Sequence, residues 1–145
     1  MTSVSRLLET ALYVEDLERS AGFYQRVLGL ESFDGPSLDF EPTSRTLRPF
    51  QIPGGQILLL FRKGSTTAAA VRSGGTIPPH DGSGRLHLAF AISAADLEHW
   101  LERLRSHGVA IEGEMVWPRG GTSIYFRDPD GHLLELATPG VWSIY

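Results

Sequence analysis

Two stretches of the chain repeat the same order of hydrophobic and polar positions. Residues 7–30 read LLETALYVEDLERSAGFYQRVLGL, and residues 84–111 read GRLHLAFAISAADLEHWLERLRSHGVAI. Each begins with a short strand-like run and meets an acidic or small polar break. Each then continues with the spacing of an amphipathic helix and ends at a glycine before an aliphatic residue. The pattern predicts two copies of one structural unit.

Both copies carry the start and stop signals of a helix. In the first copy, Asp16 is the expected N-cap and Gly29 the left-handed C-cap. In the second copy, Ser93 and Asp96 form the expected capping pair, and Gly108 ends the helix. The predicted apolar helix faces are Leu17, Phe23, Tyr24, Val27 and Leu28 in the first copy and Leu97, Trp100, Leu101 and Leu104 in the second.

Strand-like runs follow each helix, so each copy is predicted to be a βαβββ module. Module one spans about residues 5–64 and module two about 85–140, within a single domain of residues 1–145. The segment between them, residues 65–84, is rich in Gly, Ser, Thr and Pro and is expected to be a linker loop. The strands expected after the helices are residues 31–39, 46–52 and 56–62 in the first copy and 114–117, 122–127 and 132–137 in the second.

Strand alternation places three titratable residues on the less bulky faces of these strands. Glu9 shares a face with Ala11 and Tyr13, and His87 occupies the equivalent place in the second copy. Glu135 lies within the last apolar run. A lone glutamate there is most often solvated, but the joint placement of Glu9, His87 and Glu135 favours a ligand set if the copies pack edge to edge. Two carboxylates and one imidazole suit one divalent ion of Zn, Mn, Fe or Ni.

Composition narrows the possible chemistry. The 145 residues include no cysteine, which excludes disulfides, thiolate-bound zinc, iron–sulfur clusters and thiol nucleophiles. A net charge of −4 with scattered basic residues argues against a nucleic-acid partner. Without a membrane span or a signal-peptide pattern, the protein is expected to be soluble and cytoplasmic, with no membrane partner.

The stretches LYVEDLERSAGFYQRVLGL, LHLAFAISAADLEHWLERLRSHGV and YFRDPDGHLLEL resemble the vicinal oxygen chelate superfamily. That superfamily includes glyoxalase I, bleomycin-resistance proteins, fosfomycin-resistance thiol transferases and extradiol dioxygenases. The resemblance implies an α+β fold in which two tandem βαβββ modules form a cup-shaped, curved mixed sheet with helices on the outside. It also implies a homodimer and a metal site whose ligand positions are here Glu9, Leu59, His87 and Glu135.

Leu59 departs from the glyoxalase I pattern, because a catalytic glutamate would stand at that position. The three remaining ligands are closer to the pattern of the thiol transferases and the dioxygenases. The core Tyr-x-x-Asp-Pro-x-Gly-x-x-x-Glu fits Tyr125 to Glu135, but no histidine stands at positions 116 to 118, where an extradiol dioxygenase would need one. Ring cleavage is therefore disfavoured.

The leading hypothesis is a metal-dependent, glyoxalase-like enzyme that chelates a small oxygenated substrate through adjacent oxygens, of lyase, isomerase or transferase type. A bleomycin-type drug-binding protein and a fosfomycin-type thiol transferase remain alternatives. Glu135 doubles as the catalytic base, and Tyr125 either binds a substrate oxygen or packs. His80 is expected to be an exposed loop residue unless the loop folds over the cup, and His132 a turn or rim residue. The candidate substrate-binding residues are Tyr13, Arg48, Phe50, Leu59, Trp117, Arg119 and His80.

Overall fold

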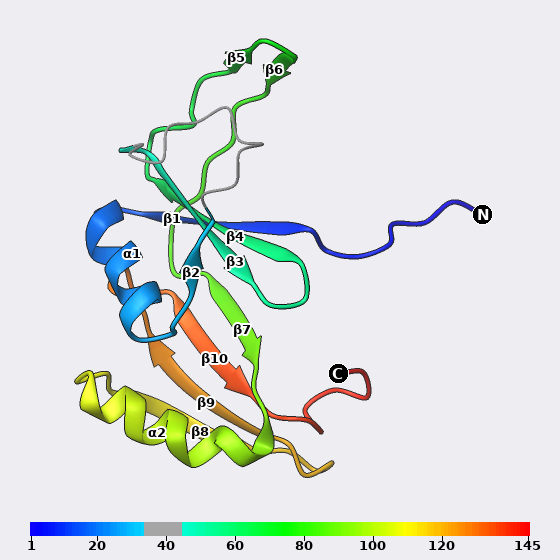
Figure 1. The fold of residues 1–145 in the computed structure, drawn as a ribbon, viewed down its shortest axis with the longest axis vertical. Helices are drawn as coiled ribbons and strands as arrows, with labels where there is room; N and C mark the ends of the chain where they lie inside the picture. Colours follow the sequence, from blue (N-terminus) through cyan, green and yellow to red (C-terminus); the bar gives the residue numbers. More distant parts are fainter. Residues whose placement is uncertain (34–44) are drawn as a thin grey trace. The chain divides into compact units, whose positions relative to one another are not determined.

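The described residues form two compact units, each built as a βαβββ module. The computed structural model describes residues 1–33 and 45–145, and the units are Met1–Ser83 and Gly84–Tyr145. Each unit has its own four-stranded mixed sheet, accompanied by an α-helix (Figure 1). The predicted α+β class with two βαβββ modules is confirmed.

The first unit begins with strand β1, and β4 returns to lie beside it. The sheet order is β1-β4-β3-β2, with β1 parallel to β4 and the other neighbours antiparallel. The strand expected over residues 31–39 is present as the two residues of β2, and residues 34–39 lie outside the described part of the chain. The elements are β1 (Glu9–Val14), α1 (Leu17–Arg26), β2 (Glu31–Ser32), β3 (Leu47–Ile52) and β4 (Gln56–Arg62).

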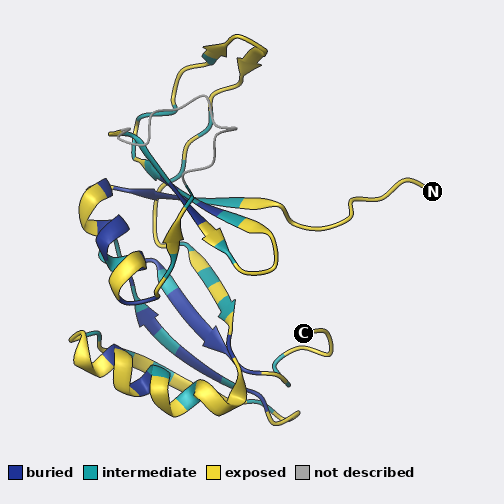
Figure 2. Cartoon of the chain, in the orientation of Figure 1, coloured by how far each residue is buried: buried dark blue, intermediate teal, exposed yellow. Residues whose placement is uncertain are grey.

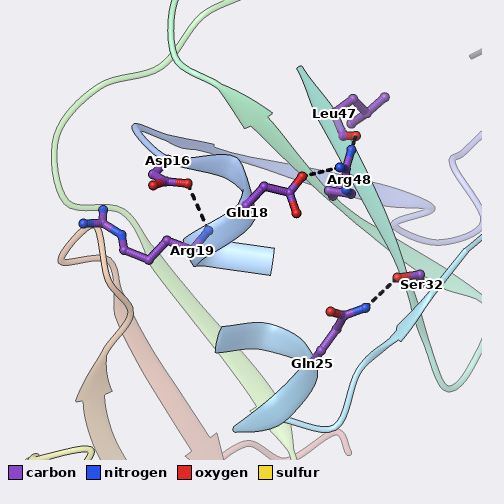
Figure 3. Close-up of polar contacts among 7 residues, drawn as sticks. All are labelled: Asp16, Glu18, Arg19, Gln25, Ser32, Leu47 and Arg48. Carbon is purple, nitrogen blue, oxygen red and sulfur yellow. Dashed lines mark hydrogen bonds and ion pairs between the residues drawn. The ribbon is translucent and has the colours of Figure 1, made fainter. Parts of the chain in front are cut away.

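Helix α1 has the caps that the sequence predicts. The Oδ1 atom of Asp16 accepts a hydrogen bond from the backbone N–H of Arg19 at 3.0 Å. Beyond the other end, Gly29 has a φ of 70°, a left-handed conformation that glycine adopts without a Cβ clash. Figure 3 shows the Asp16 cap together with an ion pair that joins Glu18 of α1 to Arg48 of β3. The ion pair joins α1 to the sheet of its own unit.

A short hairpin lies in the segment that was expected to be a loop. Strands β5 (Ala70–Arg72) and β6 (Gly75–Ile77) pair antiparallel as a separate two-stranded sheet. Val71 and Ile77 are exposed. The expectation of a linker loop was wrong for these residues, because two turn residues between the strands let the chain pair with itself. Composition alone shows the turn formers and does not show this pairing.

The second unit repeats the topology of the first. Its sheet order is β7-β10-β9-β8, with β7 parallel to β10 and the other neighbours antiparallel. Strand β8 begins at Ile111, earlier than the predicted start at Glu114. The elements are β7 (His87–Ala91), the 3-10 helix η1 (Ala94–Asp96), α2 (Leu97–Ser106), β8 (Ile111–Val116), β9 (Thr122–Arg127) and β10 (Leu133–Ala137).

Helix α2 starts through the 3-10 turn η1, which alters the predicted cap. The hydroxyl oxygen of Ser93 accepts a hydrogen bond from the backbone N–H of Ala95 at 3.2 Å, so Ser93 caps η1. Asp96 makes no side-chain cap bond. The expected Ser93–Asp96 pair is therefore present only at its serine end. Gly108 has a φ of 69° and ends the helical segment as predicted.

One face of each sheet carries the buried apolar side chains, as the alternation predicts. Figure 2 shows that most of β10 and much of β9 are buried. The opposite faces carry Glu9, His87 and Glu135. The core side chains include Val14, Tyr24, Phe50, Leu58 and Leu60 in the first unit and Leu104, Ile124, Phe126, Leu134 and Leu136 in the second.

Strand register confirms that the two units are repeats of each other. In the first unit Glu9 pairs with Ile57, and in the second unit His87 pairs with Leu133. Two residues further along the last strands stand Leu59 and Glu135. Glu9 and His87 therefore occupy the same place in the module, and Leu59 occupies the place of Glu135.

Candidate functional site

In the second unit, His87 and Glu135 lie side by side on the face opposite the core. The Nε2 atom of His87 is 3.1 Å from the Oε2 atom of Glu135. The imidazole is half-exposed, whereas the side chain of Glu135 is only 9% exposed. The pair arises because β7 and β10 are parallel neighbours and both side chains belong to the same set of alternating positions.

The second nitrogen of the His87 ring determines what this contact requires. Nδ1 lies 3.0 Å from the carbonyl oxygen of Leu133. A carbonyl oxygen can only accept, so Nδ1 carries a proton and donates. In a neutral imidazole Nε2 then presents a lone pair to a carboxylate oxygen. Nε2 and Oε2 can then share a proton or bind one metal ion together.

The other carboxylate oxygen of Glu135 accepts hydrogen bonds from two hydroxyl groups of β9. The hydroxyl of Ser123 donates to Oε1 at 2.5 Å, and the hydroxyl of Tyr125 donates to the same atom at 3.3 Å. The indole Nε1 of Trp117 in turn donates to the Ser123 oxygen at 2.8 Å. The carboxylate is therefore oriented from one side and leaves Oε2 facing His87.

This arrangement fits a metal ion through two donors. A histidine ligand usually donates its other ring N–H to a carbonyl or carboxylate, which is what Nδ1 of His87 does. Within either unit, the described residues place no three His, Asp or Glu side chains close enough to hold a metal. Glu9 belongs to the first unit, and its convergence with His87 and Glu135 stays a prediction.

In the first unit, the corresponding face is apolar around Leu59. Its neighbour across β1 is Ala11, and its neighbour across β3 is Pro49. Ile57 and Phe61 flank it on the same face of β4. No carboxylate stands at the position equivalent to Glu135, so this strand offers a hydrophobic wall instead of a ligand.

His80 is held against this same face. Its Nδ1 lies 2.6 Å from the hydroxyl oxygen of Tyr13, and its ring meets the Phe61 ring edge-on at 4.9 Å between centroids. The backbone is clamped by Thr66, whose carbonyl accepts the His80 N–H at 3.0 Å and whose hydroxyl donates to the His80 carbonyl at 2.6 Å. The expectation of an exposed loop histidine was therefore wrong. Sequence reasoning lacked the long-range contact between residues 13 and 80.

Tyr13 keeps its proton in this cluster. Burial raises the pKa of the Tyr13 phenol above its ordinary value of 10.0, and the negative charge of Asp81 raises it further. The phenol is therefore neutral near pH 7 and available for hydrogen bonding with His80.

Two of the candidate substrate-binding residues lie on the other side of the first sheet. Phe50 is fully buried, with its ring 6.2 Å from that of Tyr24 in α1. Arg48 pairs with Glu18 of the same helix. Both differ from the expectation that they line the ligand-holding face, because the pairing of β3 with β4 turns alternate residues from 48 onward toward α1. We leave both out of the proposed site.

His132 has a structural role that the sequence did not reveal. It is 1% exposed, and its Nδ1 accepts a hydrogen bond from the backbone N–H of Leu86 at 3.0 Å. Its own N–H donates to Oδ1 of Asp128 at 2.9 Å. His132 lies in the turn between β9 and β10, as expected, but it is not at the rim, because its imidazole is buried and bonds to the chain just before β7. Arg119, by contrast, is exposed in the turn after Trp117.

Comparison with known proteins identifies the family. Residues 6–136 match the family model described as Glyoxalase/Bleomycin resistance protein/Dioxygenase superfamily. The chain belongs to this superfamily. The match covers both βαβββ units and confirms the predicted resemblance.

Individual relatives point to more than one activity. The chain is 32% identical over 126 residues to the metallothiol transferase FosB of Staphylococcus haemolyticus, covering 86% of this chain and 77% of that protein. It is 43% identical over 51 residues to the fosfomycin resistance protein FosX of Listeria innocua, which is 34% of this chain and 38% of the length of FosX.

The fold is also shared with a solved structure, that of a lactoylglutathione lyase from Agrobacterium tumefaciens. The TM-score is 0.83 at 31% identity, covering 99% of this chain and 100% of that chain. By their names this lyase and the FosB transferase are enzymes, in agreement with the expectation of an enzyme. In the part of the chain that is described, no helix combines the length and apolar character needed to cross a membrane.

Proposed function

We propose that this superfamily member is a metal-dependent enzyme that acts on a small substrate chelated through adjacent oxygens. The observation that carries the proposal is the contact between Nε2 of His87 and Oε2 of Glu135, two atoms placed so that one divalent ion can bind both. The His87 imidazole is half-exposed, so the pair is open to solvent on one side, while the Glu135 carboxylate beside it is buried.

The proposed ligands are Glu9, His87 and Glu135. Glu9 joins the pair because it occupies in β1 the place of His87 in β7, and a repeat that brings those strands together would bring both side chains to one ion. Zn, Mn, Fe and Ni all accept such nitrogen and oxygen donors. When bound, the ion would polarise substrate oxygens or lower the pKa of a bound water molecule.

Residues around the ligands supply the remaining chemistry. The 3.3 Å bond from Tyr125 to Glu135 is long, so the Tyr125 hydroxyl can turn to a substrate oxygen at little cost. Glu135 is the proposed base, because it is the carboxylate held at this site. Tyr13, Leu59, His80 and Arg119 are the proposed substrate-contacting residues, with Leu59 giving an apolar wall.

Within this class, thiol transfer to an oxygenated substrate is the favoured reaction, and a lyase reaction is the second candidate. The first is supported by the similarity to FosB and by the absence of a carboxylate at Leu59. The second is supported by the fold shared with lactoylglutathione lyase along the whole chain. A metal-free, drug-sequestering protein is the rival outside this class, and in it a shared proton would join His87 to Glu135.

The experiment is metal analysis of the full chain purified without chelator, for the wild type, His87→Ala and Glu135→Gln. The wild type is expected to hold close to one divalent ion per chain, and both variants to lose it. His99→Ala, which changes an exposed histidine of α2, is the matched control and should keep the metal. A metal-free wild type that binds bleomycin tightly would overturn the proposal in favour of the sequestering rival.

Activity assays then separate the two reactions. The metal-loaded chain is given either fosfomycin with a thiol, or methylglyoxal with glutathione. Consumption of fosfomycin only in the presence of thiol supports the transferase, and formation of lactoylglutathione supports the lyase. Glu135→Gln should abolish whichever reaction is found.

A homodimer is also proposed, because β1 and β7 are edge strands of their sheets and open edges favour association. Light scattering on the eluting protein would test it. A mass equal to one 15.9 kDa chain would overturn the dimer.

A further inference from the structure

The hydrogen bonds that lead from Trp117 to Glu135 have fixed directions. An indole N–H can only donate, so the Ser123 oxygen, 2.8 Å away, must accept. A carboxylate can only accept, so the Ser123 proton must point to Oε1 of Glu135 at 2.5 Å. Trp117 thus determines in which direction the serine hydroxyl donates.

The direction of the Ser123 hydrogen bond is important because both Ser123 and Glu135 are buried. Ser123 is fully buried and Glu135 is 7% exposed, so water does not replace a lost partner easily at either residue. With Trp117 bonded to its oxygen, the Ser123 hydroxyl has one role, which is to hold Oε1. Tyr125 reaches the same oxygen. Oε1 is occupied by hydroxyl donors, and Oε2 remains for the contact with His87.

The backbone of Trp117 is held in a tight turn after β8. The backbone N–H of Trp117 donates to the Gly121 carbonyl at 2.7 Å. The backbone N–H of Gly120 donates to the Trp117 carbonyl at 2.9 Å. Gly121 has no room for a side chain, because a Cβ there would lie 2.3 Å from the backbone nitrogen of Val141. The turn therefore fixes the backbone of Trp117, from which the indole reaches Ser123.

We infer that Trp117 is a positioning residue that acts through Ser123 to orient Glu135, so that Oε2 is the oxygen offered to a divalent cation beside His87. This inference rests on the proposed function, because it concerns the strength of that cation site. It assigns Trp117 to the support of the site through its N–H group, a role distinct from contact with substrate.

The test measures Mn²⁺ binding to the metal-stripped full chain by titration calorimetry. Trp117→Phe keeps an aromatic ring and removes the N–H, and it is expected to weaken Mn²⁺ binding by about 10- to 100-fold, the usual effect of losing a group that orients a ligand. Trp100→Phe makes the same exchange on α2, where Trp100 contacts Arg103, and should leave the affinity unchanged.

A double-variant cycle shows whether Trp117 acts through Ser123. Ser123→Ala should weaken Mn²⁺ binding by at least as much as Trp117→Phe, and adding Trp117→Phe to Ser123→Ala should cause little further loss. A full, additive loss in the double variant would overturn the inference. Should Trp117→Phe not fold, an unchanged Mn²⁺ affinity in Ser123→Ala alone would also overturn it.

The outcomes also separate this inference from the function on which it rests. A wild type without Mn²⁺ affinity would overturn both. A wild type that binds Mn²⁺ and a folded Trp117→Phe variant with the same affinity would overturn the inference alone. Thermal unfolding of the metal-free variants serves as the readout of folding.

Discussion

The hydroxyl oxygen of Tyr13 lies 2.6 Å from Nδ1 of His80, joining the first strand of the chain to a residue 67 positions later. Between Thr66 and His80 the chain leaves the sheet, forms the β5–β6 hairpin and returns. Two hydrogen bonds between Thr66 and His80, together with the contact between His80 and Tyr13, join the two ends of this segment. His80 therefore fastens the hairpin to the sheet face that carries Glu9.

If His80 fastens the hairpin, its removal should loosen the segment between Thr66 and His80. We expect His80→Ala to speed amide hydrogen exchange across residues 67–79, because the imidazole contacts with Tyr13 and Phe61 are lost. Hydrogen exchange followed by mass spectrometry is the measurement. The exposed His107→Ala serves as control. Equal exchange rates in the wild type and His80→Ala would show that the Thr66 bonds to the His80 backbone hold the hairpin without the imidazole.

The raised pKa of Tyr13 predicts a loss of stability at alkaline pH. The folded state favours the neutral phenol, so this contribution is complete below pH 10.0 and is lost as the pH rises through the higher folded-state pKa. Burial also raises the pKa of Tyr145, so the comparison must be between variants. The fall in unfolding free energy above pH 10.0 should be shallower in Tyr13→Phe than in the wild type, as followed by denaturant titrations. Identical slopes would contradict the assignment.

Gly82 is expected to tolerate no side chain, because a Cβ there would lie 2.3 Å from the ring of Tyr13. Gly82→Ala must displace that ring from its contact with His80, and it should lower the unfolding free energy by about 1–3 kcal/mol. Gly74→Ala is the matched control, since nothing lies within 4 Å of its Cβ position, and it should change stability by less than about 0.5 kcal/mol. Urea unfolding would compare them, and equal losses would refute the packing argument.

The buried His132 should matter for stability as a hydrogen-bond acceptor. His132→Phe retains a ring but leaves the Leu86 N–H without its acceptor, and it should cost about 1–3 kcal/mol of unfolding free energy. The same exchange at the exposed His107 provides the comparison for thermal unfolding. A His132→Phe variant as stable as His107→Phe would show that Leu86 finds another partner.

The sequence by itself determined the elements whose formation is local. Caps such as Asp16, the left-handed Gly29 and the alternation along β4 and β10 depend on residues a few positions apart, so the predicted helices and most strands agree with the structure. The repeat also determined the equivalence of Glu9 with His87, because two similar patterns fold with the same strand register. These features follow from backbone hydrogen bonding and from which side chains must leave water.

The tertiary structure decided what depends on contacts between distant segments. The burial of His132, the contact of His80 with Tyr13 and the position of Phe50 under α1 each join residues more than 25 positions apart. Such contacts form only when strand pairing sets the register, and no local pattern encodes them. The Trp117–Ser123–Glu135 chain joins residues only 6 and 12 positions apart, but it too forms only when the pairing of β9 with β10 brings the hydroxyl to the carboxylate.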